Sequence, residues 1–113
     1  MSREITCHQF FDGNELHGPR RVVFADDGLI ESIDKYVGIP ECAVVCPGFV
    51  DIQMNGFDDV HVANASTQDL QRLDQNLFAN GTTSWLGTIV TAPLDKMSFS
   101  LDVLQEAFQS GQV

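Results

Sequence analysis

The residue pattern changes at Pro47-Gly48, and this change limits the folds that the chain can adopt. Before it lie short β-rich segments separated by turn residues, and after it apolar strands alternate with amphipathic helices. Alternation of strands and helices is typical of an α/β architecture with a parallel sheet. We therefore predict two parts of different class, residues 1–46 and residues 47–113.

The first part has the pattern of a small sheet. Asp26-Asp27-Gly28 is a hairpin signal, because Asp and Gly tolerate positive φ. The expected strands are residues 4–11, 21–25, 29–33 and 43–46, and the expected loops are residues 14–19 and 38–41. We expect this sheet to have exposed edges.

The second part begins with a strand and continues as helix, strand and helix. Ser66 or Thr67 can cap a helix that ends at Asn80-Gly81, and a second helix is expected over residues 95–110. The expected apolar faces are Leu70, Leu73, Leu77 and Phe78 on the first helix, and Met97, Leu101, Leu104 and Phe108 on the second. The strand between them, residues 83–90, is apolar enough to be buried on both faces.

The charge of the chain argues against two classes of partner. Six basic and sixteen acidic residues give a formal charge of −10, which repels nucleic acids and anionic lipid surfaces. No apolar stretch is long enough to span a bilayer, and the N-terminus lacks a signal-peptide pattern. We expect a cytoplasmic protein that binds neither nucleic acid nor membrane.

Three cysteines, Cys7, Cys42 and Cys46, are an odd number without a secretory context. This favours reduced thiols over disulfides. A zinc site built from these cysteines and His8 is an alternative, but the spacing of Cys42 and Cys46 is loose for one and Cys46 belongs to a predicted strand.

The stretch Pro47-Gly48-Phe49-Val50-Asp51-Ile52-Gln53-Met54-Asn55-Gly56 carries most of the functional information. Side chains two apart on a strand share a side, so Asp51, Gln53 and Asn55 are expected on one face. The spacing alone favours the interpretation that Gln53 and Asn55 are simply hydrogen-bonding residues at the end of a strand. Asp51 is expected to act as a structural acceptor that holds the following loop.

This stretch resembles the first barrel strand of the amidohydrolase superfamily, with amides at Gln53 and Asn55 where two metal-binding histidines usually lie. The Gln-x-Asn-Gly form is similar to the N-acetylglucosamine-6-phosphate deacetylase branch. The similarity continues through residues 81–85 and 87–91, and it extends more loosely to the turn at Asp26.

The resemblance implies an α/β fold: part of a small β-sandwich over residues 1–46, then the first two β/α units of a TIM-type (β/α)8 barrel over residues 47–113. A complete barrel needs roughly 250 residues, so the barrel is expected to be incomplete. The family's metal-ligating Glu, its two later histidines and its catalytic Asp lie further along than the segments matched here. No catalytic residue and no metal ligand is therefore predicted in this chain.

The predicted site residues are Gln53, Asn55 and Gly56, which would line the substrate pocket or lie beside the metal. Amide oxygens are weaker ligands than imidazole for a transition metal, so one divalent ion, zinc or iron-like, is expected, held by residues outside this chain. Gly56 would let backbone approach the ligand. Asp58, Asp59 and Gly87 depart from the family pattern, and His61 and Trp85 are expected to be a solvated histidine and a core residue.

The activity implied by the resemblance is metal-dependent hydrolysis of N-acetylglucosamine 6-phosphate to glucosamine 6-phosphate and acetate, in amino-sugar catabolism. The metal would polarise the acetamide carbonyl and activate water, while a carboxylate transfers the proton. This chain alone is expected to be inactive and to form homo-oligomers. Two alternatives stay open: a non-catalytic truncated fragment or designed chain that self-associates, and an amidohydrolase with another amide substrate.

Overall fold

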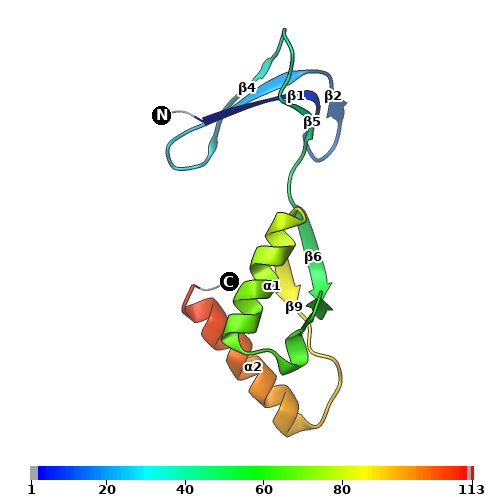
Figure 1. The fold of residues 1–113 in the computed structure, drawn as a ribbon, viewed down its shortest axis with the longest axis vertical. Helices are drawn as coiled ribbons and strands as arrows, with labels where there is room; N and C mark the ends of the chain where they lie inside the picture. Colours follow the sequence, from blue (N-terminus) through cyan, green and yellow to red (C-terminus); the bar gives the residue numbers. More distant parts are fainter. Residues whose placement is uncertain (1–2, 112) are drawn as a thin grey trace. The chain divides into compact units, whose positions relative to one another are not determined.

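The computed structural model describes residues 3–111 and 113, and it divides into two compact units, Met1–Pro47 and Gly48–Val113 (Figure 1). The boundary between the units thus falls between Pro47 and Gly48. Met1 and Ser2, at the N-terminus where the sequence lacks a signal-peptide pattern, lie outside the described residues.

The first unit is a five-stranded sheet in which β1 is central. Its strands are β1 (Arg3–Phe11), β2 (Leu16–His17), β3 (Arg20–Phe24), β4 (Ile30–Lys35) and β5 (Cys42–Val45). The order is β2-β1-β3-β4, and β5 pairs with β1 in parallel. The predicted hairpin between β3 and β4 is confirmed: Gly28 has φ +84° and its N–H donates to the Ala25 carbonyl at 2.9 Å.

Strand β2 lies within residues 14–19, which the sequence predicts as a loop, so that prediction is wrong for Leu16 and His17. The two residues become a strand because they pair with Phe11 and Phe10 at the end of β1. The connecting turn is held by Asp12, whose Oδ1 accepts the N–H groups of Asn14 and Glu15 at 2.8 and 2.7 Å. A contact of 2.6 Å with His17 Nε2 and these two bonds lower the pKa of Asp12 to about 2.

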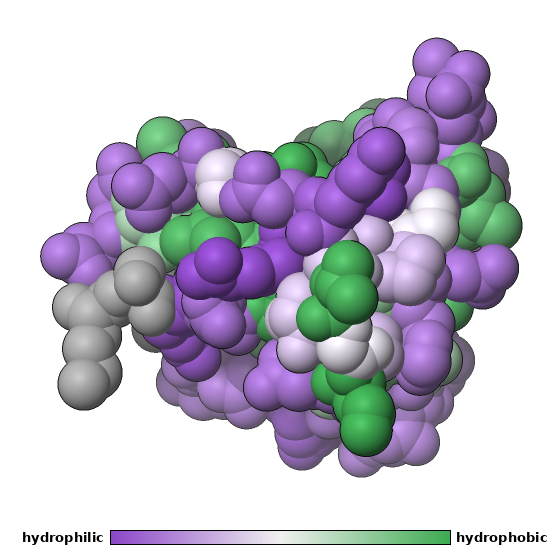
Figure 2. Space-filling model, turned by 90° about the horizontal axis from the view of Figure 1, so that it is seen from above, coloured by the Kyte–Doolittle hydropathy of each residue, from purple (hydrophilic) through white to green (hydrophobic). Residues whose placement is uncertain are grey.

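The first unit buries only a small apolar cluster. Cys7, Phe10 and Val22 form its centre. Large apolar side chains elsewhere in the unit are exposed, most of all Val37 at 97% and Ile39 at 92%. Apolar patches lie among hydrophilic side chains on the face seen in Figure 2. A sheet with so few buried residues has little hydrophobic stabilisation of its own.

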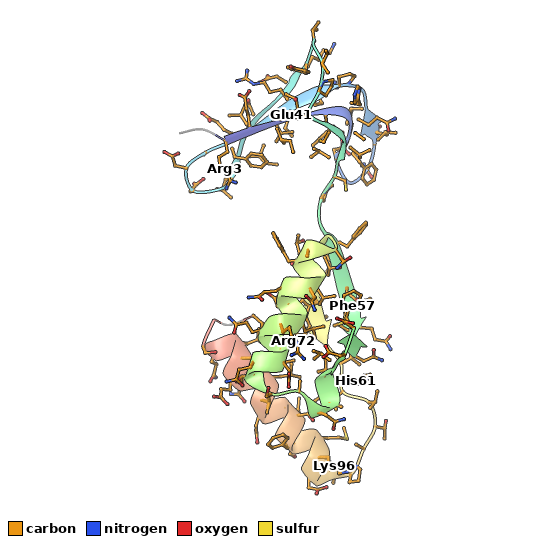
Figure 3. All side chains as sticks on the ribbon, viewed as in Figure 1. Arg3, Glu41, Phe57, His61, Arg72 and Lys96 are labelled. Atoms are coloured by element: carbon orange, nitrogen blue, oxygen red, sulfur yellow. The ribbon has the colours of Figure 1, made fainter. Side chains whose placement is uncertain are left out.

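The second unit contains a strand-helix-strand crossover followed by a helix. Its elements are β6 (Phe49–Met54), β7 (Gly56–Phe57), β8 (Val60–His61), the 3₁₀ turn η1 (Val62–Asn64), α1 (Thr67–Ala79), β9 (Thr82–Gly87) and α2 (Leu94–Gln109). Strands β6 and β9 pair in parallel. The predicted succession of strand, helix, strand and helix is confirmed. The β7–β8 hairpin, with Phe57 and His61 on its two strands (Figure 3), and η1 are not predicted by the sequence pattern.

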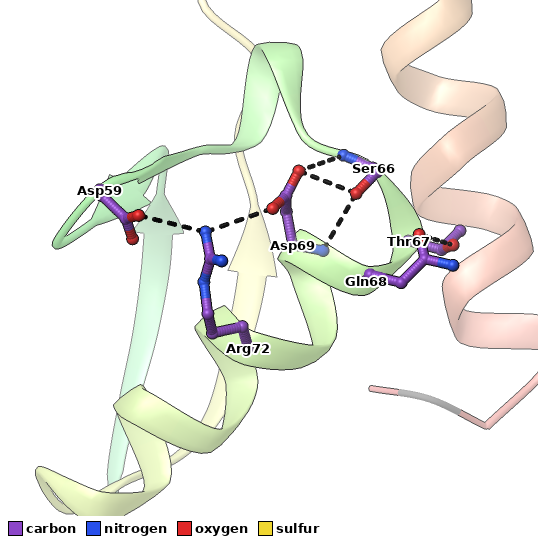
Figure 4. A network of polar contacts seen from close by, with 6 residues as sticks. All are labelled: Asp59, Ser66, Thr67, Gln68, Asp69 and Arg72. Atoms are coloured by element: carbon purple, nitrogen blue, oxygen red, sulfur yellow. Dashed lines mark hydrogen bonds and ion pairs between the residues drawn. The ribbon is translucent and has the colours of Figure 1, made fainter.

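Helix α1 begins at a capping box, as expected for Ser66. Ser66 Oγ accepts the Asp69 N–H at 3.2 Å, and Asp69 Oδ2 accepts the Ser66 N–H at 3.0 Å (Figure 4). The bonds that Asp69 accepts from Ser66 lower the pKa of Asp69. The helix buries Leu70, Leu73 and Leu77, but Phe78 is 69% exposed, so the prediction that Phe78 belongs to the core face is wrong.

Two further predictions in this unit need correction. Strand β9 ends at Gly87 rather than at residue 90, and Trp85 is its only buried residue, because β6 and β9 form a two-stranded sheet with an uncovered face. Helix α2 buries Ser100, Leu104 and Ala107, whereas Leu101 and Phe108 are more than half exposed. Small side chains allow close approach here: Ser100 Oγ donates to the Ala63 carbonyl of η1 at 2.7 Å.

Neither helix of the described part of the chain has the length and apolarity required to cross a bilayer.

Candidate functional site

The predicted site residues lie at the carboxyl end of β6, beside the carboxyl end of β9. Met54 pairs with Gly87, and the Thr88 N–H donates to the Met54 carbonyl at 2.8 Å, which joins the two strand ends. Gln53 and Asn55 are both exposed at this edge. Ligands of α/β proteins bind outside the carboxyl ends of parallel strands, so this edge is the candidate site.

The end of β6 is irregular. Asp51 pairs with Trp85 and Met54 with Gly87, so three steps on β6 correspond to two on β9. One extra residue in a strand is a β-bulge, which redirects side chains and is frequent beside active sites. The strict alternation predicted for Asp51, Gln53 and Asn55 is therefore interrupted. Asp51 is an acceptor, as expected: its Oδ1 accepts the Gln53 N–H at 2.9 Å and holds the bulge.

Packing within the chain explains why residue 56 is a glycine. A Cβ at this position would lie 2.6 Å from the Val60 carbonyl oxygen and 3.2 Å from His61 Cα. Both are backbone atoms of the facing strand, which cannot move aside as the end of a side chain can. The close approach that glycine permits here is that of β8 to β7.

The departures at Asp58 and Asp59 lie in the turn between β7 and β8. Phe57 pairs with Val60, so the turn has two residues, and Asp58 has φ +57°. Positive φ at the first central residue is the type II′ pattern, in which glycine is favoured. Asp58 thus carries backbone strain that glycine would not.

Replacing Asp58 with glycine is expected to raise the free energy of unfolding of the second unit by up to about 1 kcal/mol, because glycine adopts the left-handed region without a Cβ clash. Urea unfolding followed by Trp85 fluorescence measures this. The control is Asp59→Gly, at the neighbouring residue without positive φ. Equal effects of the two substitutions would contradict the explanation.

Asp59 connects this turn to helix α1. Arg72 Nη2 lies 3.3 Å from Asp59 Oδ2 and 3.2 Å from Asp69 Oδ1 (Figure 4). All three side chains are substantially exposed, so these ion pairs contribute little to stability. The sequence pattern does not predict this link, because Arg72 is thirteen residues from Asp59 and no local signal joins them.

Gly87 and Trp85 belong to the packing of the second unit. A Cβ on Gly87 would lie 2.9 Å from Leu104 Cδ2, so helix α2 fills the space that the missing side chain leaves. Trp85 is 9% exposed, and its Nε1 donates to Asp74 Oδ1 at 2.8 Å. The expectation that Trp85 is a core residue is confirmed. His61 is exposed, as expected for a solvated histidine.

The described residues contain no group of three or more His, Cys, Asp or Glu side chains placed to hold a metal ion. The cysteine and His8 alternative therefore lacks a ligand cluster in the described part of the chain. Cys7, Cys42 and Cys46 are free thiols, and burial raises the pKa of Cys42.

Two recesses are lined by other residues than those of the candidate site. One, of about 540 Å³, lies in the first unit and is lined mainly by β1, β3 and the turn after β3, including Ile5, Phe24 and Ala25. The other, of about 330 Å³, lies between η1 and the start of α2, beside Asn64, Lys96 and Phe99. Neither of these two recesses is lined by Gln53 or Asn55, whose side chains are exposed at the edge of the sheet.

Comparison with known proteins gives similarity along nearly the whole chain. It is 31% identical over 109 residues to N-acetylgalactosamine-6-phosphate deacetylase of Escherichia coli O157:H7, covering 96% of this chain and 28% of that protein. It is 28% identical over 123 aligned positions to N-acetylglucosamine-6-phosphate deacetylase of Vibrio furnissii, covering 98% of this chain and 31% of that protein. The chain thus spans less than a third of the length of these relatives. No protein-family model matches it.

Solved structures show the same fold. N-acetyl-D-glucosamine-6-phosphate deacetylase from Mycobacterium smegmatis matches with a TM-score of 0.80 at 19% identity, over 97% of this chain and 33% of that one. A mutant of the same enzyme in complex with N-acetyl-D-glucosamine-6-phosphate matches with a TM-score of 0.81 at 19% identity, over 99% of this chain and 31% of that one. The arrangement of strands and helices in this chain therefore recurs in part of a larger structure.

Proposed function

Because the chain resembles the N-terminal portion of N-acetylhexosamine-6-phosphate deacetylases over nearly all of its length, we propose that it forms the corresponding part of such an enzyme. The reaction is hydrolysis of the acetamide of N-acetylglucosamine 6-phosphate to glucosamine 6-phosphate and acetate. The observation that carries this proposal is the similarity to two deacetylases across 96% and 98% of the chain. In this proposal the first unit is part of a small β-sandwich, and the second is the start of a (β/α)8 barrel.

The exposed carboxyl edge of β6 supports a role for Gln53 and Asn55 as pocket residues. Amide side chains donate and accept hydrogen bonds without charge, so they suit the hydroxyl and acetamide groups of a sugar. Gly56 shapes the same edge through the hairpin. The proposed divalent metal ion is held by residues outside this chain, since the described residues offer no ligand cluster, and the chain alone is inactive.

The composition of the chain supports a proposal about the protein's cellular location and its partners. An excess of acidic residues disfavours nucleic acids and anionic membranes as partners, and unpaired cysteines suit the cytoplasm. Self-association is supported by the exposed apolar residues of the β6–β9 sheet, among them Ile52 at 75% and Leu86 at 61%. We therefore propose that the enzyme of which this chain is a part is a cytoplasmic homo-oligomer that acts on a small phosphosugar.

A chimera tests the proposal. The matched N-terminal segment of the Vibrio furnissii enzyme is replaced by this chain, and acetate release is measured with a divalent metal ion. Both N-acetylglucosamine 6-phosphate and N-acetylgalactosamine 6-phosphate are supplied, because one of the relatives is named for each. The chain alone is expected to be inactive and the chimera active. A chimera that folds like its parent but releases no acetate would contradict the proposal.

Substitutions in the same chimera test the site residues. Gln53→Ala and Asn55→Ala are each expected to lower kcat/KM about tenfold or more, the range seen when groups that orient a metal site or its ligands are removed. The matched control is His8→Ala, an exposed residue of the first unit, which should leave kcat/KM unchanged. Unchanged kcat/KM in the two site variants would show that Gln53 and Asn55 do not act in the pocket. It would leave the proposed family assignment intact.

A further inference from the structure

We propose that Asn55 is a site of spontaneous deamidation, in which the backbone nitrogen of Gly56 attacks the side-chain amide of Asn55. The chain contains two Asn-Gly pairs, Asn55-Gly56 and Asn80-Gly81. The structure distinguishes them by the hydrogen bonds of the reacting groups. The inference does not depend on the proposed function.

The reaction needs a free backbone N–H on the residue after the asparagine. Its nitrogen forms a bond to Cγ of Asn55, the bond from Cγ to Nδ2 breaks, and ammonia leaves with the amide proton. Water then opens the resulting five-membered succinimide at either carbonyl and leaves aspartate or isoaspartate. Glycine favours the attack because it has no Cβ to hinder the nitrogen and its backbone is the most permissive.

The hairpin register leaves the Gly56 N–H unpaired with the facing strand. Phe57 and Val60 flank a two-residue turn and are the hydrogen-bonded pair, so the next pair, Gly56 with His61, is a non-hydrogen-bonded pair. The Val62 N–H donates to the Asn55 carbonyl at 3.0 Å, which agrees with this alternation. The Gly56 N–H therefore points away from β8, and outside strand pairing the described residues provide no acceptor for it.

The Asn55 side chain is also accessible. Asn55 lies between β6 and β7, belongs to neither strand and is exposed. Within the described residues its amide makes no hydrogen bond that would hold it away from the Gly56 nitrogen. Both reacting groups are thus free in the folded protein.

The second pair is protected by the end of helix α1. The Gly81 N–H donates to the Phe78 carbonyl at 3.0 Å, and Asn80 Nδ2 donates to the Asn76 carbonyl at 2.8 Å. Both the attacking nitrogen and the leaving amide must break a hydrogen bond before they can react. Each of these bonds must first be lost in a local opening of the helix end. We therefore expect the deamidation rate at Asn55 to be at least roughly tenfold higher than that at Asn80.

Deamidation would change the candidate site. It adds one negative charge to a chain whose formal charge is already −10. Isoaspartate also inserts a methylene group into the backbone between β6 and β7. The bond from Val62 to the Asn55 carbonyl and the pairing of Gly56 with His61 would then no longer fit their register.

The test is incubation of the folded 113-residue chain in mildly alkaline buffer, followed by peptide mapping with fragmentation to locate each amide-to-acid conversion. Conversion at Asn55, with isoaspartate among the products, should exceed that at Asn80 roughly tenfold or more. The variant Asn55→Gln should lose the fast conversion, because glutamine would need a larger ring. Conversion at Asn80 as fast as at Asn55 in the folded chain would overturn the proposal.

The same chain in concentrated urea serves as the matched control. Unfolding removes the helix bonds of Asn80 and Gly81, so the conversion rate at Asn80 should rise to that at Asn55. If the two rates stay as different in urea as in the folded chain, the local sequence rather than the hydrogen bonds sets them, and the structural explanation is wrong.

Discussion

Replacement of Gly48 by alanine is expected to lower the free energy of unfolding of the second unit by about 3 kcal/mol, the upper part of the range for overpacking. A Cβ on Gly48 would lie 2.2 Å from both Cγ2 and Oγ1 of Thr83 and 2.7 Å from its Cβ. Rotation of the Thr83 side chain cannot relieve a contact with Cβ. The backbones at the start of β6 and β9 must therefore separate, which weakens the bond from the Phe49 N–H to the Gly81 carbonyl at 2.8 Å.

Urea unfolding followed by Trp85 fluorescence measures this loss, since Trp85 is the only tryptophan and lies in the second unit. The control is Gly18→Ala, where no atom lies within 4 Å of the added Cβ. Urea unfolding of this variant followed by circular dichroism should show little change in the free energy of unfolding. The double variant Gly48→Ala/Thr83→Ala removes the two shortest contacts and should recover part of the stability. A Gly48→Ala protein as stable as the parent would show that the two strands are not packed this closely.

Truncation of Leu73 to alanine is expected to destabilise the second unit by about 2–5 kcal/mol, through the lost transfer free energy and the cavity left behind. Leu73 is 0% exposed and belongs to the cluster that joins α1 to β9 and α2. The measurement is again the urea midpoint and slope followed by Trp85 fluorescence.

Phe78→Ala, on the same helix, is the matched control. Phe78 is 69% exposed, and a surface substitution of this kind changes stability by about 0.5 kcal/mol or less. The pair of variants compares a buried with an exposed apolar residue on one helix. An equal loss from Phe78→Ala would show that another surface covers it in solution.

The limits of sequence reasoning are clearest in helix α2. The apolar periodicity that predicts the helix also predicts Leu101 and Phe108 on its buried face, yet the buried face contains Ser100 and Ala107. Periodicity detects a helix because large apolar residues recur along it. Periodicity does not show which side of the helix packs closely against a neighbouring segment. Small residues such as Ser100 and Ala107 lie on that side because the two segments are close together.

In the candidate site, too, some features can be predicted from the sequence and others cannot. The pattern Gln53-x-Asn55-Gly56 at the end of an apolar strand is visible in the sequence, and the strand β6 is confirmed. The bulge between Asp51 and Met54, the hairpin that requires Gly56 and the link from Asp59 to Arg72 are not visible there. Each of these depends on a partner from another strand or helix.

The sequence by itself determined the change of architecture at Pro47-Gly48, the β3–β4 hairpin, the capped start of α1 and the position of the amide pair. These features depend on backbone preferences and hydrogen bonds within a few residues. Only the tertiary structure decided which apolar side chains are buried and how β6 and β9 pair. These outcomes depend on contacts between segments distant in the chain, whose geometry no local pattern encodes.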